Sequence, residues 1–228
     1  MINHEFRTPL TTVVTGAELL KEGHILDDEM RYAILDDMTR DGKRLEELID
    51  QMLTVARVEN FGLGLTLREY RFSSLWDDIQ AGHHSLKLAA KPSFGEEMVI
   101  NTDPAVVRTI IASLVDNALK HGASTVRLRV SLSEPFTPDV VAVQPPQGAM
   151  FLVIEDDGPG IDHDFLPRAF DKFEKRSSHS GTGLGLYLVR MMVKALGAGL
   201  TVSTGAGGTR VAIAIPTLHA PVHQTVSA

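Results

Sequence analysis

Residues 151–160 read Phe-Leu-Val-Ile-Glu-Asp-Asp-Gly-Pro-Gly, an apolar strand that runs directly into a turn with two glycines. A second glycine-rich stretch, Gly181-Thr182-Gly183-Leu184-Gly185-Leu186, opens a segment with the apolar spacing of a helix. Glycines let backbone N–H groups approach an anion closely, and the N-terminus of a helix adds partial positive charge. The two stretches together therefore predict an α/β domain that holds a phosphate-bearing ligand.

Two other interpretations start from the same glycines. A lone Gly-x-Gly-x-Gly is also typical of a flexible turn before a helix, with no ligand at all. A Rossmann site is disfavoured by the order of the elements. Its phosphate loop lies in the first βα turn of the domain, with an acidic residue about twenty positions further on. The glycine turns here come late in the chain, after several expected strands and helices.

The flanking sequence predicts strands and helices on a mixed sheet. Asp103 followed by Pro104 is typical of a helix start, with the carboxylate as cap and the proline in the first turn. Four prolines between 134 and 148 indicate a loop insertion, and Phe61-Gly62-Leu63-Gly64 indicates a hinge. The expected strands are 68–72, 126–130 and 151–154, and the expected helices are 74–90, 104–121 and 184–196.

Residues 1–60 are expected to form two helices that pack as a hairpin. Apolar positions recur at alternating steps of four and three, the spacing of a heptad seam, and residues 21–27 break it. Gly23 is the expected stop, and Asp27 or Asp28 the expected cap of the second helix. One hairpin cannot cover a stripe on each arm well, so the pattern favours a homodimeric four-helix bundle, with a coiled-coil linker as the alternative. The seam residues are Phe6, Leu10, Val13, Ala17 and Leu20, then Ile34, Met38, the polar exception Asp41, Leu45, Leu48, Met52 and Val55.

The expected helix at 104–121 ends in polar side chains that suit a nucleotide. Asn117 and Lys120 are three positions apart, so they project from neighbouring points of one helix face. An amide oxygen is a hard ligand that suits Mg²⁺, and an ammonium group suits phosphate. An ordinary solvated helix face is the alternative interpretation of these two residues.

Five motifs resemble, in order and spacing, those of the ATP-binding domain of sensor histidine kinases, part of the wider family of Hsp90, MutL and the type II topoisomerases. The match covers most of the chain. The motifs are Asn117-Ala-Leu-Lys-His121 (N box), Asp156-x-Gly158-x-Gly160 (G1 box), Phe170-Asp-Lys-Phe173 (F box), Gly181-Thr-Gly-Leu-Gly-Leu186 (G2 box) and the turn Gly205-Ala-Gly-Gly-Thr209.

The resemblance implies a role for each matching residue. Asp156 accepts the adenine amino group, and Thr209 lies near the adenine through water. Asn117 holds Mg²⁺, while Lys120 approaches the phosphates of ATP. The other expected nucleotide-binding residues are His121 of the N box, Gly158 and Gly160 of the G1 box, Phe170 and Phe173 as lid anchors (with core packing as the alternative), and Gly181, Thr182, Gly183, Leu184, Gly185 and Leu186, which wrap the triphosphate.

The sequence departs from the family pattern in two places. The family usually has a second asparagine one turn before the magnesium ligand, where this chain has the shorter Ser113. The lid between Phe173 and Gly181 is also short. These departures put the magnesium geometry and the phosphate contacts in question. The polar lid side chains available for phosphate are Lys175, Arg176, His179 and Ser180.

The stretch His4-Glu5-Phe6-Arg7-Thr8-Pro9-Leu10 resembles the H box that carries the phosphoacceptor histidine of the same kinases. His4 is expected off the seam, facing solvent. Glu5 is expected to accept the other ring N–H, which fixes the tautomer and raises the nucleophilicity of the free nitrogen. Thr8, one turn further on, is expected to orient a water for the reverse reaction, and Pro9 to bend the helix. An ordinary surface histidine is the alternative, and the rest of the motif argues against it.

Charge and composition limit the possible partners. A net charge of -7 leaves no basic surplus for the phosphates of nucleic acid, which excludes that partner. The absence of cysteine excludes disulfides and thiolate metal sites. No apolar run reaches about 18 residues, so we expect no membrane contact in this stretch and a cytoplasmic location. Because the chain begins three residues before His4, we expect a piece of a longer protein whose upstream sensor region a membrane could anchor.

These observations predict an α+β protein: a hairpin that forms a dimeric four-helix bundle (1–60), an α/β sandwich ATP-binding domain with a mixed sheet (61–216) and a flexible tail (217–228). The expected activity is Mg-ATP-dependent autophosphorylation of His4, then phosphotransfer to an aspartate of a response regulator receiver domain. Three alternatives stay open. They are a degenerate kinase acting as an ATP-binding scaffold, an ATPase of the Hsp90/MutL type that makes no use of His4, and a regulator phosphatase that uses Thr8.

Overall fold

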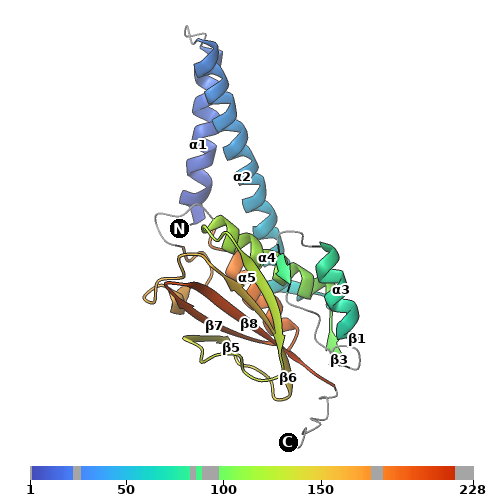
Figure 1. Cartoon of the computed structure of the whole chain (residues 1–228). Coiled ribbons are helices and arrows are strands. Elements are labelled where there is room, and N and C mark those ends of the chain that lie inside the picture. Colours follow the sequence, from blue (N-terminus) through green and yellow to red (C-terminus); the bar gives the residue numbers. More distant parts are fainter. Residues whose placement is uncertain (1, 23–26, 83–85, 89–97, 176–181, 219–228) are drawn as a thin grey trace, which may run out of the picture.

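A long helical hairpin stands on an α/β domain (Figure 1). The computed structural model describes residues 2–22, 27–82, 86–88, 98–175 and 182–218, without the side chains of residues 2–5, 61, 82 and 86–88. Helices α4 and α5 of the domain lie between the hairpin and the sheet, so the hairpin approaches the domain from its helical side (Figure 1).

The hairpin consists of α1 (Ile2–Lys21) and α2 (Asp28–Phe61). The Asp27 carboxylate accepts the Met30 N–H at 2.8 Å, so Asp27 is the N-cap and this prediction is confirmed. Gly62, with a φ of 71°, caps the other end of α2 through its N–H to the Val58 carbonyl. The expected stop at Gly23 lies outside the described residues.

The contact between the two helices differs from the predicted seam at two positions. Leu10 is 51% exposed and Ala17 is also exposed, whereas Pro9 and Gly16 are buried against α2. A Cβ at Gly16 would lie 2.7 Å from Cγ of Met38, so the helices approach most closely where α1 has no side chain. Leu10 and Ala17 therefore stay exposed beside α2 in the single chain, and their predicted place in the seam of a four-helix bundle stays a prediction.

A small sheet of β1 (Arg68–Arg71) and β3 (Val99–Thr102), with α3 (Phe72–Gly82), forms one edge of the domain. The predicted strand at 68–72 ends at Arg71, since fully buried Phe72 begins α3. The predicted helix at 74–90 was wrong in its second half. It ends at Gly82, and β2 (Leu86–Leu88) adds to the main sheet instead.

The main sheet has six strands in the order β2-β4-β6-β8-β7-β5. Only β2 and β4 are parallel, and all other neighbours are antiparallel, so the predicted mixed sheet is confirmed. The strands not yet given are β4 (Val126–Ser131), β5 (Val140–Val143), β6 (Ala149–Asp156), β7 (Gly199–Gly205) and β8 (Gly208–Pro216).

Both faces of the sheet are covered. Along β6, Leu152 and Ile154 face the main core with α4 (Pro104–Lys120) and α5 (Gly185–Ala195), whereas Val153 faces a second cluster against Phe136. Phe136 belongs to the stretch at 134–148, which was predicted as a loop. That prediction was wrong at β5, since the β-branched run between its prolines pairs with β7.

The helix at 104–120 begins as predicted, because the Asp103 carboxylate accepts the N–H groups of Ala105 and Val106. At the C-terminal end, the N–H of Thr217 donates to the Gly148 carbonyl and that of Leu218 to the Val99 carbonyl. The rest of the expected tail lies outside the described residues. Within the described ranges, no helix is both long and apolar enough to cross a membrane.

Candidate functional site

A cavity of about 880 Å³ opens between α4, the start of α5 and the turns that follow β6 and β7. Most of the residues expected to bind the nucleotide line it, although they come from five separate stretches of chain. Those that line it are Asn117, Lys120, His121, Asp156, Gly158, Gly160, Phe170, Thr182, Gly183, Gly185, Leu186 and Thr209.

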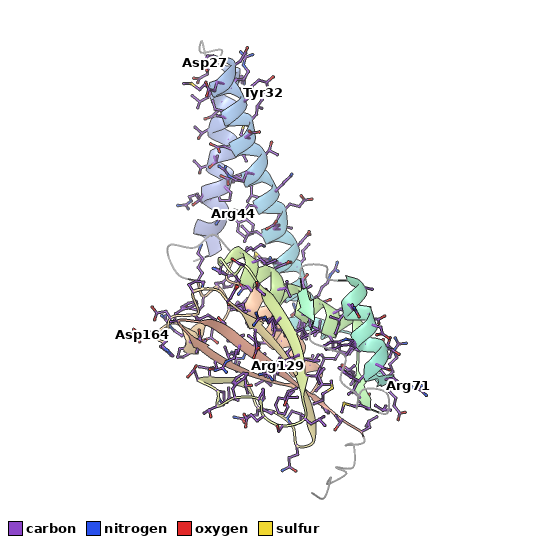
Figure 2. The ribbon with its side chains drawn as sticks, in the orientation of Figure 1. Asp27, Tyr32, Arg44, Arg71, Arg129 and Asp164 are labelled. Atoms are coloured by element: carbon purple, nitrogen blue, oxygen red, sulfur yellow. The ribbon has the colours of Figure 1, made fainter. Side chains whose placement is uncertain are left out.

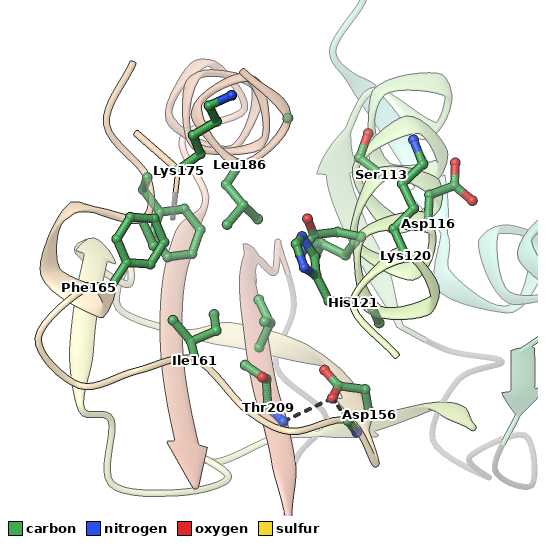
Figure 3. A pocket seen from close by; sticks show the side chains of 18 of the residues that line it. Ser113, Asp116, Lys120, His121, Asp156, Ile161, Phe165, Lys175, Leu186 and Thr209 are labelled. Carbon is green, nitrogen blue, oxygen red and sulfur yellow. Dashed lines mark hydrogen bonds between the residues drawn. The ribbon is translucent and has the colours of Figure 1, made fainter. Parts of the chain in front are cut away.

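Asp156 stands at one end of the cavity (Figure 3). Its Oδ1 accepts the N–H of Gly158 at 2.9 Å and the N–H of Thr209 at 3.2 Å. Oδ2 has no hydrogen bond from the described residues. A carboxylate held in this way at the wall of a cavity presents an acceptor of fixed position to a ligand.

The turns that follow β6 and β7 leave no room for a side chain at Gly160 and Gly208. A Cβ at Gly208, whose φ is 116°, would lie 1.8 Å from the Asp156 carbonyl oxygen. A Cβ at Gly160, whose φ is 77°, would lie 2.4 Å from the Gly205 carbonyl oxygen. The Ile161 N–H also donates to Oγ1 of Thr204 at 2.7 Å. These contacts explain why both turns need glycine: they lock against each other and hold Asp156 in place.

The neighbouring Asp157 has a structural role. Its Oδ1 accepts the N–H groups of Ser124 at 2.7 Å and Thr125 at 2.8 Å, which ties the turn after β6 to the loop after α4. These backbone bonds, that from Thr125 foremost, lower the pKa of the Asp157 carboxyl. Asp157 does not line the main cavity, so of the two adjacent carboxylates only Asp156 faces it.

Apolar side chains form the wall across from α4. Figure 3 shows Ile161, Phe165 and Leu186 on one side of the cavity and the polar residues of α4 on the other. Phe170, which is 3% exposed, lies behind them as part of the main core. A flat apolar slot that ends at a carboxylate fits a planar heterocycle with an amino group.

The α4 side of the cavity is polar. Ser113, Asp116 and Asn117 contribute oxygen donors, and Lys120 and His121 contribute nitrogen groups. Within the part of the chain that the structure describes, no cluster of three or more His, Cys, Asp or Glu residues could hold a metal. A hard cation that takes most of its ligands from phosphates and water fits this oxygen-rich edge.

The two ends of the short lid meet beside the cavity. The Phe173 N–H donates to the Gly183 carbonyl at 2.9 Å, and Phe173 has a φ of 67°. A Cβ at Gly183 would lie 2.7 Å from the Phe173 carbonyl carbon. Oγ1 of Thr182 accepts the Leu184 N–H at 3.2 Å, just before α5 begins. Phe173 and Leu184 themselves do not line the cavity, and Gly181 lies outside the described residues.

The sequence analysis missed a contribution from the hairpin. Arg44, Glu47 and Gln51 of α2 line the same cavity. The heptad pattern reports only how α2 packs on α1, so nothing in it identified these residues.

The stretch at the start of α1 does not line the cavity with any described side chain. The backbone of His4 and Glu5 belongs to the first turns of α1, and their side chains lie outside the described set. Thr8, one turn further along, is exposed.

Comparison with known proteins finds the same family that the sequence motifs resemble. The family described as "Histidine kinase-, DNA gyrase B-, and HSP90-like ATPase" matches residues 102–219, and the "His Kinase A (phospho-acceptor) domain" matches residues 1–61. Sensor histidine kinase CusS of Escherichia coli O157:H7 is 26% identical over 94% of this chain and 44% of its own length. The chain spans less than half the length of the curated relatives it matches.

Solved structures show the same fold. Full-length ShkA in complex with AMPPNP has a TM-score of 0.58 and 25% identity, over 95% of this chain and 45% of that one. Histidine kinase ThkA in complex with the response regulator protein TrrA has a TM-score of 0.64 and 16% identity, over 94% of this chain and 59% of that one.

Proposed function

This chain belongs to the sensor histidine kinases, with a phospho-acceptor domain followed by an ATPase domain of the HSP90-like family, and we propose that it phosphorylates itself on His4 with Mg-ATP. The observation that carries the proposal is that one cavity brings together residues of the N box, the G1 box and the G2 box with Thr209. We assign the phospho-acceptor hairpin to residues 1–60 and the ATP-binding domain to 61–216.

In the proposed site, adenine occupies the apolar slot, and its amino group donates to the Asp156 carboxylate. Selection of ATP over GTP follows, because guanine carries a carbonyl oxygen where adenine has the amino group, and two acceptors repel. Thr209, with its N–H on Asp156, belongs to the same adenine contact. The triphosphate extends toward the start of α5, where Gly183 and Gly185 leave N–H groups open and the helix dipole attracts anions.

The magnesium ion that accompanies ATP would offset part of the phosphate charge. We assign Asn117 as its protein ligand, and the oxygen donors around it on α4 fit this assignment. Ser113 lines the cavity one turn before Asn117, where the family usually has a second asparagine. Lys120 supplies a positive charge for the phosphates.

In the proposed reaction, an imidazole nitrogen of His4 attacks the γ-phosphorus, the bond to the β–γ bridging oxygen breaks, and ADP leaves. Glu5 orients the ring by accepting the other N–H and takes up its proton. Positioning and neutralisation of charge supply most of the rate enhancement in phosphoryl transfer. The phosphoryl group then passes to an aspartate of a response regulator, a partner type that the ThkA complex contains.

We propose that two copies of the chain form a homodimer through their hairpins. Apolar side chains of both helices stay exposed in the single chain, and burying them in a four-helix bundle removes that area from water. They include Leu10, Val14 and Leu19 of α1, with Leu35, Ile49 and Leu53 of α2. We assign Thr8, which is exposed, to the reverse reaction on the regulator. The use of ATP and a receiver domain implies a cytoplasmic site of action.

The test is incubation with γ-labelled Mg-ATP, comparing the unmodified chain with His4→Ala and with the double variant Asn117→Ala, Asp156→Ala. We expect acid-labile label on the unmodified chain and none on either variant, with nucleotide binding retained only in His4→Ala. Label that survives in His4→Ala would overturn the assignment of His4 as the phosphoacceptor. ATP bound without label would favour a degenerate, scaffolding kinase.

A further inference from the structure

One face of α2 belongs to the nucleotide cavity. Arg44, Glu47 and Gln51 recur at steps of three and four, so they share a helix face, and all three line the cavity. Leu48, four residues after Arg44 and three before Gln51, lies on the same side of the helix and is only 3% exposed. The face of Arg44, Glu47 and Gln51 lies away from the exposed apolar stripe that contains Leu53.

Two groups of contacts hold α2 against the roots of the lid. The Thr182 hydroxyl donates to Oε1 of Gln51 at one root. Before the lid, Nζ of Lys172 donates to both carboxylate oxygens of Glu59 at 2.9 Å. Oε1 of Glu59 also accepts the hydroxyl of Tyr187, on α5 after the lid, at 2.7 Å. The lid roots and the cavity wall on α2 therefore form one connected surface.

Arg44 lies on the hairpin above the α/β domain (Figure 2), and the face that it shares with Gln51 spans the level of His4. Gln51 touches Thr182, which precedes the helix start proposed for the triphosphate. Along the hairpin, Gly16 faces positions 34 and 38 of α2. His4 is twelve residues before Gly16, and the helices are antiparallel, so the level of His4 on α2 is near Leu48. The α2 face that lines the cavity therefore reaches from its contact with Thr182 to the level of His4 and one turn beyond it.

The charge of the cavity calls for a cation in this place. The carboxylates of Glu47, Asp116 and Glu174 line it, and a nucleoside triphosphate brings further negative charge. On the domain side, the described lysines that line the cavity are Lys120 and Lys175. A guanidinium group binds phosphate oxygens through two parallel hydrogen bonds, which makes it the better partner for a terminal phosphate.

We propose that Arg44 of α2 binds the γ-phosphate of ATP, so that the hairpin completes the nucleotide site when the domain is docked. This inference rests on the proposed function, because it takes ATP as the ligand of the cavity. It adds that the docked form distinguishes ATP from ADP, since ADP lacks the group that Arg44 holds. Arg44 acts here as a binding residue outside the ATPase domain.

The test measures affinities of the full chain for ADP and for an ATP analogue with an imido bridge between the β- and γ-phosphorus. We expect Arg44→Ala to weaken the analogue by about tenfold, the effect of one charge-assisted contact, while the affinity for ADP changes less than about twofold. Arg44→Lys should fall between. Arg57→Ala is the matched control, because Arg57 is an exposed arginine of the same helix that does not line the cavity.

Each outcome decides between the two proposals. Unchanged binding of the analogue in Arg44→Ala would overturn the inference and leave the nucleotide site in place. Equal loss for both nucleotides would also overturn it, since Arg44 would then not read the γ-phosphate. If the unmodified chain binds neither nucleotide, the proposed function fails and the inference fails with it. Circular dichroism of each variant shows whether the helices are intact.

Discussion

The hairpin and the ATPase domain differ in how far their apolar side chains are buried. In the domain, the main core is closed, and residues such as Phe72, Ile110 and Leu152 are fully buried. In the hairpin, few apolar residues are buried, Leu48 and Val55 among them, while Leu53 is 53% exposed. The domain can therefore fold on its own contacts, whereas the hairpin needs a second surface.

The same contrast appears in the polar groups. Hydrogen bonds fix the turns of the domain, as at Asp156 and Asp157, so its site is largely preformed. The hairpin meets the domain through a few polar contacts, part-buried at Gln51 and exposed at Glu59. Contacts of this kind are individually weak and can be remade, which suits the proposed reaction, in which the domain moves to reach the acceptor.

The largest effect should come from the locked glycine turns of the domain. Gly208→Ala places a Cβ against the Asp156 carbonyl in a backbone conformation that side chains avoid, which should cost about 4 kcal/mol of domain stability. Urea unfolding should show this loss, together with loss of nucleotide binding, while the hairpin keeps its helicity. Gly207→Ala is the control, since a Cβ there meets nothing within 4 Å. Equal behaviour of the two variants would mean that the turns are not locked.

Next in size is the exposed stripe of the hairpin. Leu53→Glu should weaken dimerisation by about a hundredfold, because two apolar side chains per dimer lose their burial and two carboxylates are desolvated. Analytical ultracentrifugation measures the change, and nucleotide binding should persist. Lys43→Glu introduces the same residue at another exposed position of α2, away from the stripe. If both variants dimerise like the unmodified chain, the stripe is not the interface.

A smaller effect is expected inside the hairpin. Gly16→Val should cost about 2 kcal/mol, since its side chain would enter the space of Met38 and Ile34 and push the helices apart. Thermal unfolding followed by circular dichroism at 222 nm measures it. Ala17→Val, at the exposed neighbouring position, is the control. A larger loss for Ala17→Val would restore the seam expected from the heptad pattern.

The smallest effect concerns the contact between the two regions. The hydrogen bonds from Lys172 and then Tyr187 lower the pKa of Glu59 from its usual 4.5. A group with a depressed folded-state pKa stabilises above its unfolded value, and this contribution is lost as pH falls through the folded pKa. The difference in Tm between the unmodified chain and Glu59→Gln should therefore be present at pH 7 and shrink below pH 4.5. A difference that stays constant down to pH 3 would mean that charge is not involved, and Glu69→Gln, at an exposed position, should show no such trend.

Much of the domain could be predicted from local sequence. The Asp103-Pro104 start of α4, the strand of β6 and the start of α5 follow from capping, apolar runs and glycine spacing. The strands β2 and β5 could not be predicted in this way. Both are short strands at the edges of the sheet, and each pairs with a strand far away in the sequence, β2 with β4 and β5 with β7. Prolines also flank β5. Only the assembled sheet provides the pairing partners.

In the site, too, some features could be predicted from the sequence and others depended on the tertiary structure. The sequence by itself identified the nucleotide motifs, because their glycine, asparagine and aspartate residues resemble those of the histidine kinase ATP-binding domain in order and spacing. Only the tertiary structure decided that Pro9 and Gly16 take the hairpin contact in place of Leu10 and Ala17. It also brought Arg44 of α2 to the cavity. Both results depend on how closely whole surfaces approach, and a local periodicity records which residues are apolar but not which neighbour covers them.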